Sequence, residues 1–207
     1  MLGVYVTVPI ACFRKGMARE FLETEQLPPP ATCYGFLLSL IGETDRRRHI
    51  GCRVAPVLLN KPQMSVVLRT VWRVKKTPLG SPGNTRPDYQ QLLSGPSASD
   101  PFISLLIWLD STKETGTNPG LETRVINALG DPTSVSRFGG LSMGESTHMV
   151  DEVSLWERVK DRHSKRTARA FLVSPKGRLT LPVWVDHVGS AGTRYATGNL
   201  EEFPLSA

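Results

Sequence analysis

Residues 75–101 constrain the fold more than any other part of the chain, because they interrupt a series of apolar strands with glycine, proline and polar residues. The residues that punctuate the segment are Gly80, Pro82, Gly83, Asn84, Pro87, Gly95, Pro96 and Pro101. Only 89–93 has the composition of a helical turn. An interruption of this length inside a compact domain is usually functional or disordered. The segment cannot form a core of its own, and apolar strands at both ends would hold it, so we expect a projecting hairpin.

The segments around this interruption alternate between strand and helix patterns. Leu2–Ile10 is rich in β-branched residues, and Met64, Val66 and Leu68 share one face by the two-residue period of a strand. The expected strands are 2–10, 50–59, 63–74 and 102–109, and the expected helices are 34–41 and 119–129. This order resembles the split βαβ arrangement of ferredoxin-like domains, which RNA-recognition folds also use. It predicts an α+β fold.

Glycine and proline also predict where the helices begin and end. Gly42 would end the first helix, whereas Asn118 would cap the second and Pro119 would occupy its first turn. From Phe138 onward the chain reads as a glycine-rich turn, a polar segment and two short apolar strands, near Phe171 and at 181–188. We therefore expect the C-terminal part to be a small β extension.

The composition indicates an ordinary globular protein with a moderate positive charge. Lys and Arg number 25 against 19 acidic residues, a formal net charge of +6, which suits a polyanionic partner without requiring one. Cys12, Cys33 and Cys52 are too widely spaced for a metal or redox pair. No apolar run reaches membrane-spanning length, and the N-terminus lacks a signal-peptide pattern. We expect a cytoplasmic protein with no cofactor, no metal and no membrane contact.

Three groups of residues could contact a phosphate backbone, because cationic side chains neutralise phosphates and glycines let backbone N–H groups approach them. The candidate RNA-binding residues are Arg14, Lys15 and Arg19; Arg69, Arg73, Lys75, Lys76, Arg86 and Tyr89; and Gly140, Ser142, Met143 and Gly144. The alternative is that the cations lie on a solvated face and that 139–146 is simply a turn. The basic segment 158–169 is equally compatible with a solvated surface and a partner-facing one.

No catalytic residue is assigned. Metal-independent RNA cleavage needs a general base for the 2′-hydroxyl and a cation near the scissile phosphate. His148 is the best-placed histidine, beside the glycine-rich segment, but a single histidine there is more often structural. Asp151 and Glu152 are adjacent and would face opposite ways on a strand, which is poor geometry for an acid–base pair.

Several blocks of the sequence resemble the CRISPR-associated family-five proteins, which belong to the repeat-associated (RAMP) group. Residues 13–20 (FRKGMARE), 28–32 (PPPAT) and 34–38 (YGFLL) are similar to that family's N-terminal signature. Residues 85–93 (TRPDYQQLL) resemble its thumb region. Residues 141–153 resemble its glycine-rich motif, particularly as found in the myxobacterial developmental-locus branch.

This resemblance implies a ferredoxin-like (RRM-type, RAMP) domain with a protruding β-hairpin thumb, 73–102, and a small C-terminal β extension. It implies two units, 1–137 and 138–207. The implied function is a non-catalytic subunit of a type I surveillance complex (Cascade), which caps the 5′ handle of the guide RNA (crRNA). Its implied partners are the large subunit and the first backbone subunit, and contact with target DNA near the PAM stays open.

Two other functions remain open at this stage. One family subtype processes precursor crRNA with tyrosine, lysine and histidine, and no matching motif places that trio here, yet a metal-independent endoribonuclease stays an alternative. The other is a structural adaptor whose basic residues meet acidic protein partners.

Overall fold

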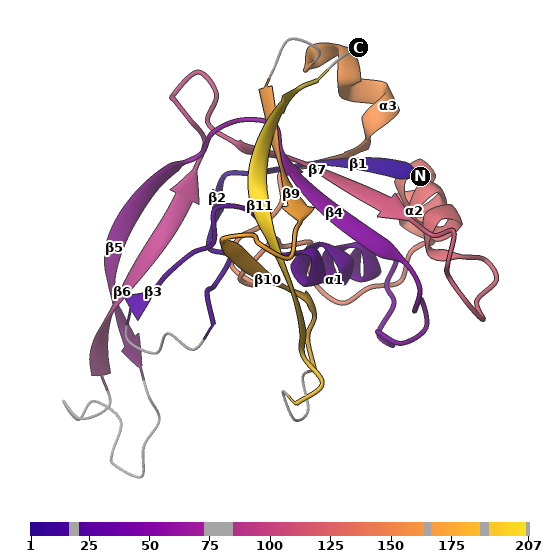
Figure 1. The fold of residues 1–207 in the computed structure, drawn as a ribbon, viewed down its shortest axis with the longest axis horizontal. Coiled ribbons are helices and arrows are strands. Elements are labelled where there is room, and N and C mark those ends of the chain that lie inside the picture. Colours follow the sequence, from indigo (N-terminus) through magenta and orange to yellow (C-terminus); the bar gives the residue numbers. More distant parts are fainter. Residues whose placement is uncertain (17–20, 73–84, 164–166, 187–190, 206–207) are drawn as a thin grey trace.

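A seven-stranded antiparallel sheet extends across the fold (Figure 1). The computed structural model describes residues 1–16, 21–72, 85–163, 167–186 and 191–205, except for the side chains of 70–72 and 85–87. In spatial order the strands are β10 (Leu179–Trp184), β11 (Arg194–Pro204), β9 (Thr167–Val173), β4 (Arg53–Leu58), β7 (Ile103–Asp110), β1 (Leu2–Val8) and β8 (Glu152–Leu155). Within the described ranges, no helix has the length and apolar content to span a membrane.

The centre of the sheet has the strand order β4-β7-β1-β8, and every neighbouring pair is antiparallel. Helix α1 (Pro30–Leu40) lies between β1 and β4 in sequence, and α2 (Leu121–Gly130) lies between β7 and β8. One helix in each crossover and this strand order are the features of a split βαβ unit. The fold is α+β, as expected from the sequence.

The sheet runs without a break across the boundary expected at residue 137. Strand β8 lies beyond that boundary and pairs with β1, while β9 pairs with β4 and carries β11 and β10 outward. The division into units 1–137 and 138–207 stays a prediction. The polar strand β11 is not among the strands expected from the sequence.

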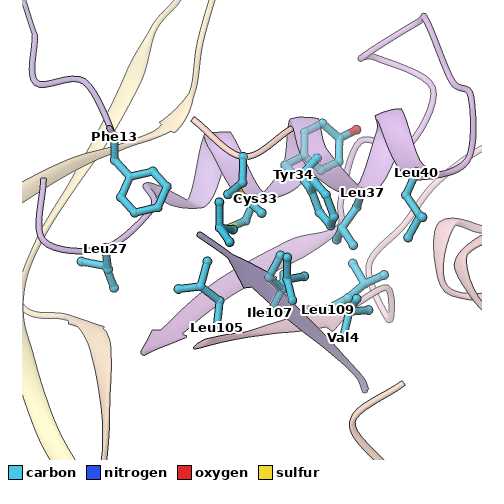
Figure 2. Packing of buried hydrophobic residues seen from close by; sticks show 14 of the residues in the cluster. Val4, Phe13, Leu27, Cys33, Tyr34, Leu37, Leu40, Leu105, Ile107 and Leu109 are labelled. Carbon is cyan, nitrogen blue, oxygen red and sulfur yellow. The ribbon is translucent and has the colours of Figure 1, made fainter. Parts of the chain in front are cut away.

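Side chains on the two faces of the sheet pack into two cores. On one face, Val4, Leu105 and Ile107 contact the apolar side of α1, where Cys33 and Leu37 are fully buried (Figure 2). The opposite core is formed by alternate residues of the same strands. Its members include Tyr5, Val57, Leu106 and Trp156 of helix α3 (Trp156–Val159). Successive side chains of β1 and β7 point to opposite faces of the sheet, so the same two strands contribute apolar residues to both cores.

The helix boundaries differ in part from those expected. Helix α1 begins earlier than the expected Tyr34, at Pro30, because the fixed φ of proline suits a first turn. It ends shortly before Gly42, whose φ of 67° is left-handed. Helix α2 begins after Gly120 rather than at Pro119, and Asn118 does not cap it. Short 3-10 turns follow at Pro132–Ser134 and Lys160–Arg162.

A long β-hairpin projects from the main sheet (Figure 1). It consists of β5 (Gln63–Trp72) and β6 (Thr85–Ser94), which pair from Gln63–Ser94 to Trp72–Thr85. Two short strands, β2 (Ile10–Ala11) and β3 (Phe21–Leu22), pair with β6 and complete a second, four-stranded sheet. A projecting hairpin is present, but its bounds differ from the expected 73–102: β5 pairs with β6, so the hairpin spans 63–94, and the expected flanking strand at 102–109 belongs to the main sheet instead. Residues 73–84 of the expected hairpin lie outside the described residues. The helical turn expected at 89–93 is wrong, because these residues belong to β6 and pair with β5.

Candidate nucleic-acid interface

The glycine-rich segment 139–149 packs against the chain that follows β2. Gly144 has φ of 95°, and a Cβ there would lie 2.6 Å from the carbonyl oxygen of Cys12, so only glycine fits. The backbone N–H of Cys12 donates to Nδ1 of His148 at 3.1 Å. The N–H of Met143 donates to the carbonyl of His148 at 3.0 Å. These contacts fix the glycine-rich segment beside residues 12–16.

Residues 12–16 are in turn tied to the base of the hairpin through Thr24. The N–H of Phe13 donates to the Thr24 hydroxyl at 2.8 Å, and the N–H of Thr24 donates to the Gln91 side chain at 3.0 Å. Arg14 forms a β-bridge with Thr24. As a result, the exposed side chains of Arg14 and Lys15 project from a strip anchored to β6.

Ion pairs connect the cations of this region to nearby carboxylates. Lys15 lies 3.7 Å from Glu23, and both side chains are about half exposed. Arg69 of β5 lies 3.7 Å from Glu145, which joins the hairpin to the glycine-rich segment. The structure therefore brings together residues from all three sequence-predicted groups: the strip after β2, the hairpin and the glycine-rich segment.

The predicted site residues fall into three classes in the structure. Arg14, Lys15, Arg69, Tyr89, Gly140 and Gly144 are exposed, and Ser142 is half-buried. Arg19, Arg73, Lys75 and Lys76 lie outside the described residues, and Arg86 is placed by its backbone alone, opposite Val71 in the hairpin. Met143 is a correction: its side chain is fully buried in the core, so it cannot contact RNA.

An exposed apolar stripe on the hairpin adds residues that sequence reasoning did not assign to a site. Met64, Val66 and Leu68 project from one face of β5 and are 52%, 54% and 62% exposed. Tyr89 lies opposite Leu68, and its ring lies 6.3 Å from that of Phe21 on β3. The sequence shows the alternation but not which face the core leaves uncovered. Such contiguous apolar stripes commonly mark interaction surfaces.

A cavity of about 630 Å³ lies between α1 and the glycine-rich segment. Gly35 and Ser39 of α1 line it together with Ser142 and Gly144. Its arginines are Arg46 and Arg137, and its aromatic residues are the buried Phe36 and the exposed Phe138. None of the four is among the site residues expected from the sequence. Phe138 is fully exposed beside Gly139, whose φ is 73°. A solvated aromatic ring next to arginines is suited to stacking on a nucleobase.

The contact between His148 and Cys12 sets the polar chemistry of this region. Among the described residues, no group of three His, Cys, Asp or Glu side chains is placed to hold a metal ion. Burial lowers the pKa of His148 below its ordinary value, and Glu145 opposes that shift. The imidazole Nδ1 accepts the Cys12 N–H, so the ring is held neutral in a structural contact.

Comparisons with known proteins bear on this geometry. No family model matches the chain. A Myxococcus xanthus (strain DK1622) protein described as CRISPR-associated protein Cas5 is 50% identical over 204 residues, which are 98% of this chain and 91% of that protein.

Two solved structures share the fold. One, titled CRISPR RNA-guided surveillance complex, has a TM-score of 0.59 at 13% identity and matches 98% of this chain and 90% of that chain. The other, titled Crystal structure of Cas protein, has a TM-score of 0.50 at 14% identity and matches 99% and 94%. At such low identity these two matches concern the fold.

Proposed function

This chain belongs to the Cas5 family of CRISPR-associated proteins, and from that membership we propose that it is an RNA-binding subunit of a type I surveillance complex. It caps the 5′ handle of the crRNA and contacts the large subunit and the first backbone subunit, in the cytoplasm. One observation carries the proposal: exposed cations lie beside the glycine-rich segment, next to a projecting hairpin. Arg14 and Lys15 follow Cys12, which is hydrogen-bonded to His148, and Arg69 pairs with Glu145.

The cations of this region are paired weakly enough for RNA to displace their partners. The Lys15–Glu23 pair is exposed and the Arg69–Glu145 pair is partly exposed, both at 3.7 Å, and surface pairs of this kind contribute about 0–1 kcal/mol. A phosphate brings charge and several acceptor oxygens to the same cations. The handle would therefore replace the two carboxylates at little cost to the fold.

The exposed apolar residues of the hairpin are evidence for contact with a neighbouring subunit. The apolar stripe of Met64, Val66 and Leu68 is exposed in this chain, and its burial against the first backbone subunit would remove that surface from water. Tyr89, half-exposed at the edge of the stripe, could stack on a base, which contributes about 1–3 kcal/mol.

We further propose that the chain binds RNA without cutting it. Two features support this. Nδ1 of His148 is occupied by Cys12, and the rings of His49 and His163 are buried. None of these three side chains therefore offers an accessible general base beside the exposed cations.

Purification of the chain with its neighbouring genes' products tests the proposed function. We expect a repeat-derived RNA to co-purify, and the isolated chain to bind the 5′ handle with an affinity that falls as salt rises. Binding that ignores salt, or co-purification of acidic protein partners with no RNA, would favour the adaptor alternative.

A further inference from the structure

A second cavity, of about 660 Å³, opens on another side of α1. Its walls come from the start of α1, the segment 47–54, the end of β9, and strands β10 and β11. It shares no lining residue with the cavity beside the glycine-rich segment. The proposed handle contacts therefore do not use it.

Arginines from three separate segments surround this cavity. Arg47 belongs to the loop after α1, Arg53 begins β4 and Arg194 begins β11, and all three side chains are exposed. No Asp or Glu is among the residues that line the cavity in the described part of the chain. Like charges gathered around one hollow raise its positive potential, so an anion is the complementary ligand.

One wall of the cavity is aromatic and held in place. Tyr34 and Trp184 line it, with ring centroids 6.0 Å apart. The guanidinium carbon of Arg46 lies 5.1 Å from the centroid of Trp184, and its Nη1 donates to the carbonyl of Val185 at 2.7 Å. The Tyr34 hydroxyl donates to the carbonyl of Arg46 at 2.8 Å. Trp184 is thus positioned before any ligand arrives.

We propose that this cavity binds one nucleotide of a single-stranded nucleic acid. The base lies against the wall formed by Trp184 and Val183, and the phosphate binds between the arginines that line the rim. A guanidinium group matches phosphate geometry with paired N–H donors, and aromatic side chains accept the face of any base. The volume lies within the range of small-ligand pockets.

An acidic protein segment would satisfy the arginines equally well, but it would leave the aromatic wall without a planar partner. The combination of arginines and aromatic rings around one cavity therefore favours a nucleotide. The inference does not depend on the proposed handle contacts at residues 14–15 and the hairpin.

The test measures binding of a fluorescent 5′-phosphorylated trinucleotide to the full chain by anisotropy, and maps a 4-thiouridine version by photo-crosslinking. We expect Arg47→Ala/Arg194→Ala to weaken binding at least about tenfold. Arg53 is left unchanged because it also faces Asp110 across the sheet. The matched control is Arg158→Ala/Arg178→Ala, which removes two exposed arginines elsewhere. Arg14→Ala/Lys15→Ala should leave the crosslink at the peptide that contains Trp184 unchanged.

Three results would overturn the inference. The first is the absence of a crosslink in the peptides that contain Tyr34 or Trp184, and the second is an equal loss of binding in the control variant. The third is binding of an oligoglutamate peptide where the trinucleotide does not bind. Melting temperatures of each variant confirm that the cavity variant is folded. If Arg14→Ala/Lys15→Ala no longer binds the handle but keeps the crosslink near Trp184, the handle site and this cavity are separate sites. Failure of one of the two proposals would then leave the other standing.

Discussion

Arg124 forms an ion pair with Glu43, in which Nη1 lies 2.5 Å from Oε2, between the end of α1 and the start of α2. The same Nη1 donates to Nε2 of His49 at 2.9 Å, so His49 carries its proton on Nδ1 and donates to Glu114 at 2.5 Å. Glu114 also accepts the N–H of Leu121 at the first turn of α2. This buried cluster fastens the loops after α1 and β7 to α2.

Arg124→Ala should destabilise the fold strongly. The substitution leaves Glu43, whose side chain is only 7% exposed, without its main partner, and it removes the donor to His49. Breaking one partner of a buried pair costs about 3–5 kcal/mol. Urea unfolding measures the change, and Arg158→Ala, at an exposed position on α3, is the control. A loss no larger than that of the control would contradict the role given to the cluster.

Acid should weaken the fold through Glu43. The hydrogen bond from Arg124 is the main reason that the pKa of Glu43 falls to about 2, from an ordinary value of 4.5. Because the unfolded chain binds this proton more readily, the stabilisation is complete above pH 4.5 and is lost as the pH falls towards 2. Glu43→Gln should flatten this part of the pH dependence of the urea midpoint. An equally steep dependence in the variant would assign the effect to other carboxylates.

His148→Ala should loosen the glycine-rich segment without changing any RNA-cleaving activity. The variant removes the acceptor of the Cys12 N–H, and an unsatisfied buried donor costs about 1–3 kcal/mol. Gel analysis of a repeat hairpin in EDTA tests the second part. If the wild-type chain cut the hairpin at one position and the variant did not, the endoribonuclease alternative would be correct.

The sequence predicts the elements that have their own periodicity or cap residues, and misses those that depend on tertiary pairing. The alternation of apolar residues in 63–74 correctly predicts β5. In contrast, the residues around Tyr89 have a helix-compatible composition, and the pairing of Tyr89 with Leu68 holds them in a strand. Strand β11 is polar because it is half-exposed, so periodicity gives it little signal.

The candidate site shows the same division between local pattern and tertiary context. Arg14 and Lys15 can be assigned from charge alone, and the structure leaves both exposed. Met143 belongs to a glycine-rich run that looks like a surface loop. However, Gly144 packs closely against Cys12, and this contact directs the Met143 side chain into the core. Burial of a single side chain in a loop cannot be inferred from spacing.

Val66→Lys should leave the fold intact and impair assembly with the backbone subunit. Val66 is 54% exposed, so its replacement should change the free energy of unfolding by no more than about 0.5 kcal/mol. In the assembled complex a charge would enter the apolar stripe and would have to be desolvated. Co-elution with the backbone subunit is the measurement. Ser65→Lys, on the opposite face of β5, is the control, and equal assembly of both variants would argue against the stripe as a contact.

Arg14→Ala/Lys15→Ala should weaken binding of the 5′ handle and reduce its salt dependence. Both side chains are exposed and the Lys15–Glu23 pair spans 3.7 Å, so the variant should lose less than about 1 kcal/mol of stability. Each phosphate contact to a single strand contributes about 0.7 to the slope of log K against log salt, so two lost contacts should lower the slope by about 1.4. Lys176→Ala/Arg178→Ala removes the same charges from the turn between β9 and β10 and should keep the wild-type slope. An unchanged slope in the Arg14/Lys15 variant would place the handle elsewhere on the chain, whereas an equal fall in both variants would mean that net charge alone governs binding.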